Sequence, residues 1–187
     1  GPVWAVAQAF EFIADDQEVI VSYCDYGTKW DFERFLAVAR GHGGAIAGYR
    51  GFHPHMLGSD NYAFCREQDG LLVEIREKAP FTSDRMSEFA SNGTYYFARG
   101  SLVKKYFQEL IDQDININGE YYVSLVYNLL VRDGLTVELF EIENMLQWGT
   151  PYDLETYKGW SRYFDRQNFT LVLSMAGRGE RFRQAGY

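Results

Sequence analysis

Apolar positions recur along the chain at two alternating spacings, one typical of helices and the other typical of strands. Apolar side chains at every third or fourth position predict helices at residues 3–13, 30–40, 101–113, 120–134 and 150–164. Short apolar or alternating runs predict strands at residues 18–24, 44–50, 93–98, 135–142 and 169–175, and two more within residues 61–75 around a turn at Gln68-Asp69-Gly70. Helices and strands that alternate in this way predict a layered α/β domain. Runs as apolar as 18–24 and 169–175 are typical of buried strands with parallel neighbours.

The last predicted strand runs directly into a turn with two closely spaced glycines. Gly177 and Gly179 would let the backbone approach an anion, and a helix that begins after them would add a favourable dipole. Arg181 offers a forked cation that suits a phosphate. A Gly-x-Gly pattern is a weak signal by itself, but its place directly after a strand strengthens the interpretation as a phosphate cradle. A polar joint at residues 165–168 separates this segment from the preceding helix.

Composition narrows the class of protein. Apolar residues make up 47% of the 187 residues and aromatic residues 17%, which excludes a disordered chain. The net charge of −8 argues against a general nucleic-acid binder, but it leaves room for a small anionic ligand held by a few donors. Cys24 and Cys65 lack metal-ligand spacing, and we expect Cys24 to be a buried thiol in a reduced, cytoplasmic protein. No apolar run reaches the length of about 18 residues that a membrane span needs, so we expect no membrane partner.

Asp25 is the first residue that could carry chemistry. It follows the apolar run 18–24, at the carboxyl end of a strand, where open α/β sheets bind ligands. Its carboxylate could hold a divalent cation that bridges phosphate oxygens. It could equally cap the helix that begins near Trp30 or shape the turn.

Two further polar pairs have both a structural and a functional interpretation. Glu77 and Lys78 follow a predicted strand, where lysine can meet a phosphate and glutamate can accept sugar hydroxyls, although surface Glu-Lys pairs are common. His53 and His55 supply only two local ligands for a metal, so we expect loop residues that could reach polar groups of a ligand.

Taken together in their order, these segments resemble the sugar-nucleotide pyrophosphorylases, the nucleotidyltransferases of the GT-A-like α/β class. The segments that carry the resemblance are "LVLSMAGRGERFRQAGY", "VIVSYCDYG", "LVEIREKAPF", "SNGTYYF", "GEYYVSLV" and "QWGTPYDLETY". The stretches "GFHPHMLG" and "QWGTP" are most similar to bacterial members tied to capsule and surface-polysaccharide biosynthesis. The resemblance implies a three-layer α/β/α sandwich with a mixed, mostly parallel sheet, here incomplete or rearranged.

The resemblance also implies a reaction and a set of site residues. A nucleoside triphosphate and a sugar 1-phosphate, or a similar phosphomonoester, would form a nucleotide sugar and pyrophosphate with the help of Mg²⁺. The implied triphosphate ligands are Gly177, Gly179 and Arg181, and the implied metal ligand is Asp25. The residues implied on the sugar-phosphate side are Glu77, Lys78, Gly93 and Glu120. Among all of these, the resemblance implies catalytic roles for Arg181, Asp25 and Lys78.

The chain departs from the family pattern in three ways. The phosphate loop comes last instead of first, and the Pro-Lys pair and base-binding segment that normally follow it are absent. Gln147, which is a poor Mg²⁺ ligand, stands where the family has a second metal aspartate. Residues 1–164 would then form the metal and sugar-phosphate side of a nucleotidyltransferase. Residues 165–187 would be the start of a second module or a strand that folds back beside residues 18–24. A third interpretation is that the sequence as a whole comprises only the ordered parts of a longer chain.

Several functions stay open on these grounds. The chain could be a nucleotidyltransferase that is inactive or weak without the absent segments, a non-catalytic sugar-nucleotide-binding or assembly module, or a glycosyltransferase of similar fold. We expect the apolar strand 169–175 to dock within its own chain or to exchange between two copies and form a homodimer.

Overall fold

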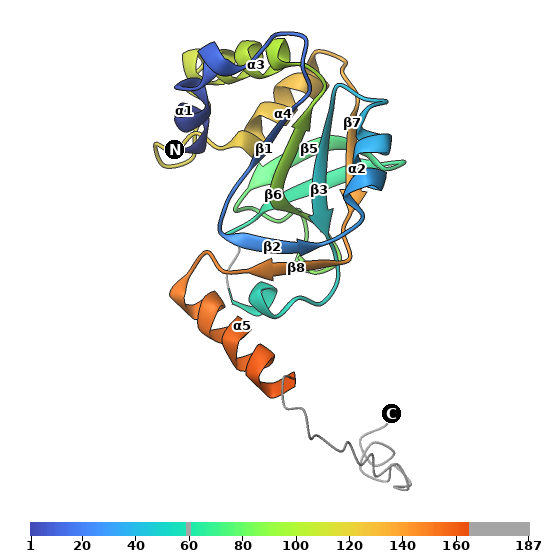
Figure 1. Ribbon diagram of the computed structural model, residues 1–187, viewed down its shortest axis with the longest axis vertical. Coiled ribbons are helices and arrows are strands. Elements are labelled where there is room, and N and C mark those ends of the chain that lie inside the picture. The colour runs from blue at the N-terminus through green and yellow to red at the C-terminus, as the bar shows by residue number, and fades with distance from the viewer. Residues whose placement is uncertain (59–60, 165–187) are drawn as a thin grey trace, which may run out of the picture.

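A six-stranded sheet runs through the molecule and carries helices on both faces (Figure 1). The structure, a computed structural model, describes residues 1–58 and 61–164. The strands are arranged in the order β1 (Val19–Ser22), β6 (Phe89–Phe97), β3 (Gly44–Tyr49), β7 (Val137–Glu141), β5 (Leu71–Glu77) and β4 (Ala63–Gln68). Because β4 also pairs with β6, the last five strands of this order close into a ring. The sheet is therefore a closed barrel and not the plain sandwich layer that the sequence predicted.

The expectation of a mostly parallel sheet is wrong for the described strands. Only β3 and β7 run parallel there, whereas β1, β3 and β4 all pair antiparallel with the long strand β6. All nine residues of β6 are buried. A fully buried strand is covered by apolar side chains on both faces, but this does not determine whether the adjacent strands run parallel or antiparallel to it. Apolar runs alone therefore misled the prediction of a mostly parallel sheet.

Strand β1 departs most clearly from what its sequence predicted. It lies at the edge of the sheet, antiparallel to β6, with half-buried and exposed residues in alternation. Ile20 is 38% exposed. Cys24 follows this strand in a bend and is exposed, so the predicted buried thiol is wrong, while Cys65 in β4 is buried.

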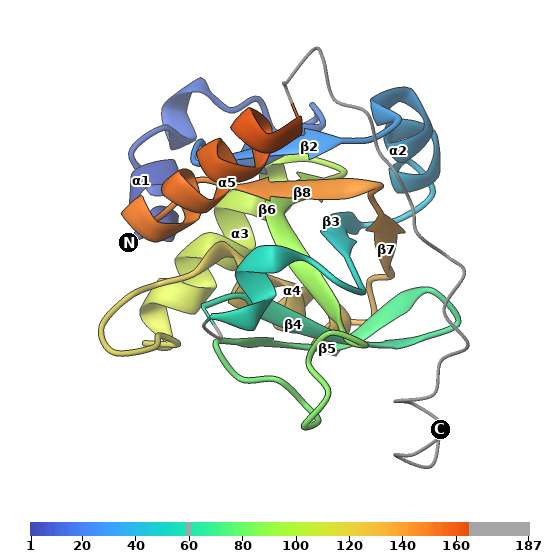
Figure 2. The same ribbon diagram turned by 90° about the horizontal axis from the view of Figure 1, so that it is seen from below.

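Helices α3 (Gly100–Asp112) and α4 (Val123–Arg132) cover one face of the sheet, together with the short α1 (Pro2–Ala7) (Figures 1 and 2). Helix α2 (Phe32–Ala39) covers the opposite face, against β3 and β7. The mixed sheet with helices on both faces agrees with the expected α/β class. The predicted helix 3–13 is shorter in the structure, and a 3₁₀ turn, η1 (Phe10–Phe12), follows α1.

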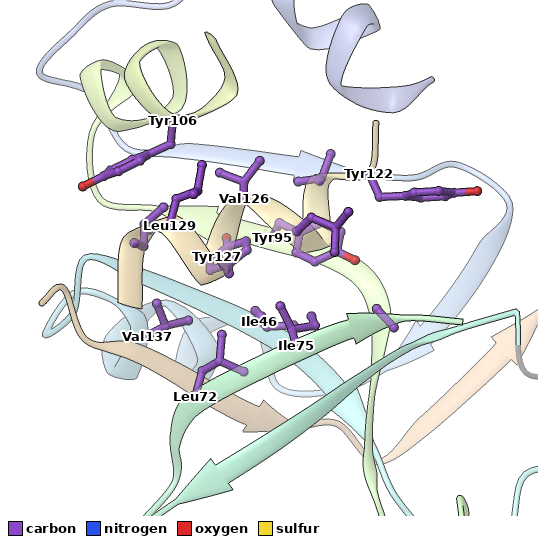
Figure 3. Close-up of a cluster of buried hydrophobic side chains, with 14 of the residues drawn as sticks. Ile46, Leu72, Ile75, Tyr95, Tyr106, Tyr122, Val126, Tyr127, Leu129 and Val137 are labelled. Carbon is purple, nitrogen blue, oxygen red and sulfur yellow. The ribbon is translucent and has the colours of Figure 1, made fainter. Parts of the chain in front are cut away.

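Each face of the sheet has its own hydrophobic core. Along β3, Ile46 packs in the core beneath α4 (Figure 3), while Ala45 and Ala47 pack in the core beneath α2. The alternation is the two-residue period of a strand between two layers. The Tyr127 hydroxyl of α4 also donates to the backbone carbonyl of Tyr96 over 2.7 Å, which ties the helix to the sheet.

A second, smaller sheet closes one end of the molecule. It consists of the antiparallel strands β2 (Tyr26–Lys29) and β8 (Asn144–Gln147), which the sequence did not predict. A 3₁₀ turn, η2 (Pro54–Leu57), lies near this ribbon, and helix α5 (Pro151–Phe164) packs against β8 (Figure 2). The Asp153 amide donates a hydrogen bond to the Thr150 hydroxyl. Thr150 therefore caps the start of α5, as the Thr-Pro pair predicted.

Several predictions fall outside the described residues. They are the joint at 165–168, the strand at 169–175, the division of the chain at residue 165, and the triphosphate ligands Gly177, Gly179 and Arg181. Within the described part of the chain, no helix is both long enough and apolar enough to cross a membrane.

Candidate functional site

A cleft of about 240 Å³ opens where the strand ends of the large sheet meet the β2–β8 ribbon and the start of α4. Four of the residues predicted for the site line it, namely Asp25, Glu77, Lys78 and Gly93. Glu120 borders it, because its Oε2 lies 4.0 Å from Lys78 Nζ. The fold thus brings together five residues that are spread over almost a hundred positions of sequence.

Asp25 lies beside Gln147, the residue that stands in place of the second metal aspartate. Tyr26 faces Gln147 in the β2–β8 ribbon, and the Asp25 carbonyl accepts a hydrogen bond from the Trp148 amide over 3.0 Å. Both side chains converge on Gly149. A Cβ placed there would lie 2.7 Å from Asp25 Oδ2 and 3.0 Å from Gln147 Nε2. The unpredicted ribbon is therefore the element that forms this part of the site.

Glu77 ends β5 as a half-buried carboxylate. The Ser124 hydroxyl, in the first turn of α4, donates to Glu77 Oε2 over 2.6 Å. Burial raises the pKa of this carboxyl, and the Ser124 hydrogen bond and the charge of Lys78 only partly oppose that shift. Glu77 is thus available to accept hydrogen bonds from a ligand, but a neutral hydroxyl is its direct side-chain partner.

Lys78 is held in a short chain of hydrogen bonds. Its backbone adopts a left-handed conformation with φ +56°, and its amide donates to the Tyr62 carbonyl over 2.8 Å. Its Nζ donates to the Tyr122 hydroxyl over 2.6 Å, and that hydroxyl donates to Glu120. The Tyr122 hydrogen bond, followed by the charges of Tyr122 and Glu120, raises the pKa of Lys78. A cation so placed at the mouth of a cleft can meet a phosphate.

Gly93 allows two aromatic rings to approach the backbone of β6. It has φ +93°, and a Cβ there would lie 3.0 Å from the Tyr23 ring and 3.2 Å from the Tyr26 ring. The Tyr23 hydroxyl is buried without a hydrogen-bond partner in the described residues. Burial, followed by the charge of Glu77, raises the pKa of Tyr23 far above its usual range.

His53 and His55 lie outside the cleft, in a buried cluster around Tyr49. His55 Nε2 is 2.9 Å from the Tyr49 hydroxyl, and His53 Nε2 accepts from the Met145 amide over 3.4 Å. Burial, followed by the charge of His53, lowers the pKa of His55 to about 4. Both rings are 7% exposed or less, so their contacts are structural and they do not reach a ligand in the cleft. The described residues contain no group of three or more His, Cys, Asp or Glu side chains that could hold a metal.

Sequence reasoning missed the aromatic side chains of the cleft. They are Tyr23, Tyr26, Tyr62, Tyr95 and Tyr122. The signal available was the number of tyrosines, 14 in the chain, and their place beside the quoted segments. Tyrosines that fill a core look the same in sequence as tyrosines that line a cleft, so the signal could not single them out.

Solved structures of other proteins share this fold, among them the following two. One is the nucleoside-diphosphate-sugar pyrophosphorylase from Vibrio cholerae RC9, with a TM-score of 0.63 over 82% of this chain and 18% sequence identity. The other is HddC from Yersinia pseudotuberculosis, with a TM-score of 0.56 over 86% of this chain and 15% identity. The match spans 60% of the first protein and 62% of the second. No protein-family model matches the sequence.

Proposed function

We propose that this chain provides the metal and sugar-phosphate side of a nucleotidyltransferase site. The reaction joins a nucleoside triphosphate to a sugar 1-phosphate or a similar phosphomonoester and releases pyrophosphate. The observation that carries the proposal is the single cleft that collects Asp25, Glu77, Lys78 and Gly93. The fold shared with a nucleoside-diphosphate-sugar pyrophosphorylase supports it.

The residues of the cleft would act by positioning and by charge. An oxygen of the phosphomonoester attacks the α-phosphorus and forms a new P–O bond. The bond between the α-phosphorus and the oxygen that bridges it to the β-phosphorus breaks, and pyrophosphate leaves with that electron pair. Lys78 would hold the attacking phosphate, and Glu77 would accept hydroxyls of the group attached to it. Such a direct transfer needs no covalent nucleophile from the protein.

Asp25 and Gln147 would hold Mg²⁺ together with oxygens of the substrates. Mg²⁺ in nucleotide enzymes is commonly bound by one or two carboxylates and by substrate phosphates, so one carboxylate and one neighbouring amide fit a weak site. When bound, the ion would offset the charge that gathers on the phosphates.

Gln147→Asp would add a second carboxylate, and we expect it to tighten Mn²⁺ binding, measured by paramagnetic relaxation of water.

The proposal is tested by binding of phosphomonoesters to the 187-residue chain. We expect Lys78→Ala to weaken binding across a phosphomonoester panel by about tenfold to a hundredfold, because a hydrogen bond to a charged group contributes about 1.5–3 kcal/mol. Lys158→Ala is the matched control, since Lys158 pairs with Glu155 on the surface of α5. Titration calorimetry would measure both. Equal affinities for the two variants would overturn the proposal.

A non-catalytic binding module is the second candidate, and Gln147 is the observation that favours it. A neutral residue at this position weakens a metal site without removing the phosphate and hydroxyl contacts of the cleft. Pyrophosphate release from a nucleotide panel with sugar 1-phosphates and Mg²⁺ separates the two functions. A chain that binds phosphomonoesters but releases no pyrophosphate, even as the Gln147→Asp variant, would be a binding module.

A further inference from the structure

We infer that the open edge of strand β1 accepts residues 169–175 of a second copy of this chain, so that two copies exchange these residues and form a dimer. Such a dimer would form whether or not the cleft has the proposed function. The backbone of β1, two hollows beside that strand and the course of α5 support it.

Strand β1 has one open edge. Among the described residues it pairs with β6 alone, and it lies outside the closed ring of strands. The Tyr23 amide continues this pairing and donates to the Gly93 carbonyl over 3.1 Å. Because backbone groups alternate in direction along an antiparallel pair, Ile20 and Ser22 direct their N–H and C=O groups away from β6. These groups are positioned to form a ladder with a further strand.

A hollow lies beside this edge on each face of the sheet. The first, of about 470 Å³, lies between α1 and β1, and Val6 and Val21 belong to its apolar lining. The second, of about 320 Å³, lies on the face that carries α2, and Ile20, Trp30 and Phe32 line it. Ile20 is 38% exposed and Phe32 is 40% exposed. Because successive side chains of a strand point to opposite faces, a strand added to β1 would fill both hollows.

Residues 169–175 have the composition that this position requires. The side chains of the run "FTLVLSM" are apolar or small, none is charged, and large ones alternate with smaller ones. The large set would face one hollow and the smaller set the other. Residues 165–187 also contain four arginines against one aspartate and one glutamate, whereas the whole chain has a net charge of −8. The donated segment is thus basic and the rest of the chain acidic, and this complementarity favours their association.

Helix α5 carries the chain away from its own β1. The start of the helix lies near the end of β1, because the Trp148 amide donates to the Asp25 carbonyl two residues before Thr150. The 14 residues of α5 span about 20 Å, and the helix leads away from the large sheet on the far side of the β2–β8 ribbon (Figure 1). Residues 165–168 can bridge at most about 14 Å when fully extended. Residues 169–175 therefore meet the edge of a second copy and not that of their own.

Two variants test the acceptor edge and the donated segment separately. Ile20→Pro removes an N–H group that faces the open edge, where strands tolerate proline. The double variant Leu171→Asp with Leu173→Asp places charges in the donated segment and leaves residues 1–164 unchanged, so it tests the dimer even where proline disturbs β1. Sedimentation velocity should show wild type with twice the mass of a single chain and each variant alone with the mass of one chain. Val73→Asp is the control and should remain a dimer, because Val73 is 39% exposed on β5.

A mixture of the two variants gives the decisive measurement. Ile20→Pro keeps the donated segment intact and the double variant keeps the acceptor edge intact, so an equimolar mixture should form a heterodimer through one exchange. A mixture that remains monomeric would overturn the inference, as would a dimer that survives both sets of substitutions. A monomeric wild type that loses stability in urea unfolding when Leu171 and Leu173 are replaced would show docking within one chain, and it would overturn the exchange.

Discussion

Single residues of the cleft owe their properties to burial more than to their neighbours in sequence. Glu77 and Lys78 are adjacent in the chain, but Glu77 is a half-buried residue at the end of β5, while Lys78 is exposed and has a left-handed backbone. The sequence could place these two residues near a site, because a strand followed by a polar pair is visible in the pattern. It could not show that burial raises the pKa of Glu77.

Glu77→Gln should change how stability depends on pH. The pKa of Glu77 is raised in the folded chain, so its favourable contribution is present below the unfolded pKa of about 4.5 and is lost as the pH rises through the folded pKa. The glutamine variant cannot ionise, so its stability relative to wild type should be higher at pH 7 than at pH 4. Urea unfolding at both pH values measures the difference.

Glu155→Gln is the control. Lys158 lowers the pKa of the exposed Glu155, so the stability that Glu155 contributes changes with pH in the opposite direction. A Glu77→Gln difference that is constant with pH would contradict the prediction.

Gly93→Ala should destabilise the chain more than Gly51→Ala does. Both glycines have positive φ, +93° and +77°, so alanine is strained at both positions, at a cost of about 1–3 kcal/mol each. Only at Gly93 does the new Cβ also meet aromatic rings, at 3.0 Å and 3.2 Å, because nothing lies within 4 Å of it at Gly51. Urea unfolding of the two variants isolates the second effect. Equal losses of stability would mean that the rings move aside without cost.

At the scale of elements, the sequence predicted well the helices and strands that have clear local patterns. It did not predict the pairing of short strands that are far apart in the chain. Helices α3 and α4 repeat apolar positions over several turns, and β4 and β5 flank a clear turn, so each lies close to its predicted range. Strands β2 and β8 have four residues each, and their pairing joins parts of the chain more than a hundred positions apart. Nothing local marks such a pair, yet it places Asp25 beside Gln147 and so completes the candidate site.

Gly149→Ala tests what the β2–β8 ribbon contributes to the site. The added Cβ would lie 2.7 Å from Asp25 Oδ2, which must then move. Since that atom is the end of a flexible side chain, we expect weaker Mn²⁺ binding and little change in the free energy of unfolding. Gly159→Ala on α5 is the control, because nothing lies within 4 Å of its Cβ position. Unchanged Mn²⁺ affinity in Gly149→Ala would show that Asp25 is not a metal ligand.

The histidine cluster beneath β8, His53 and His55, affects the stability of the elements around it and lies outside the cleft. Burial lowers the pKa of His55 to about 4, so the stability that the neutral ring contributes is present above about pH 6.5 and is lost as the pH falls toward 4. We expect wild type to lose on the order of 3 kcal/mol of stability through this residue across that window. His55→Gln, which cannot ionise, should show a flatter dependence in urea unfolding. Identical slopes for the two chains would contradict the assignment.

At the scale of the whole molecule, one ring of strands contributes side chains to two hydrophobic cores. Side chains that alternate along β3 and β6 enter the core beneath α4 and the core beneath α2. The sequence predicted the layers, because the strand and helix periods differ. It could not predict closure of the ring, which depends on two residue pairs between β4 and β6, Phe64 with Ala90 and Cys65 with Phe89, and on the single pair of Leu71 with Glu138 between β5 and β7.

Gly48→Ala should therefore destabilise the whole molecule and not one layer. Gly48 lies at the irregular step between β3 and β6, where a Cβ would come within 2.2 Å of the Phe89 ring and 2.4 Å of the Ala90 carbonyl oxygen. A backbone oxygen cannot move aside as a side chain can, so the two strands must separate. Since both cores rest on these strands, we expect a loss of roughly 3 kcal/mol or more, in the range of overpacked cores and above.

Thermal unfolding followed by two probes would measure this loss and its reach. The first probe is the fluorescence of Trp30, which packs against Phe35 in the core beneath α2. The second is far-ultraviolet circular dichroism, which reports on all helices. If the ring of strands couples the two cores, both signals should change at the same lowered midpoint in Gly48→Ala. Gly134→Ala is the control, because its positive φ adds strain at a surface turn but nothing lies within 4 Å of its Cβ position. Separate midpoints for the two signals would mean that the layers on either side of the sheet unfold independently.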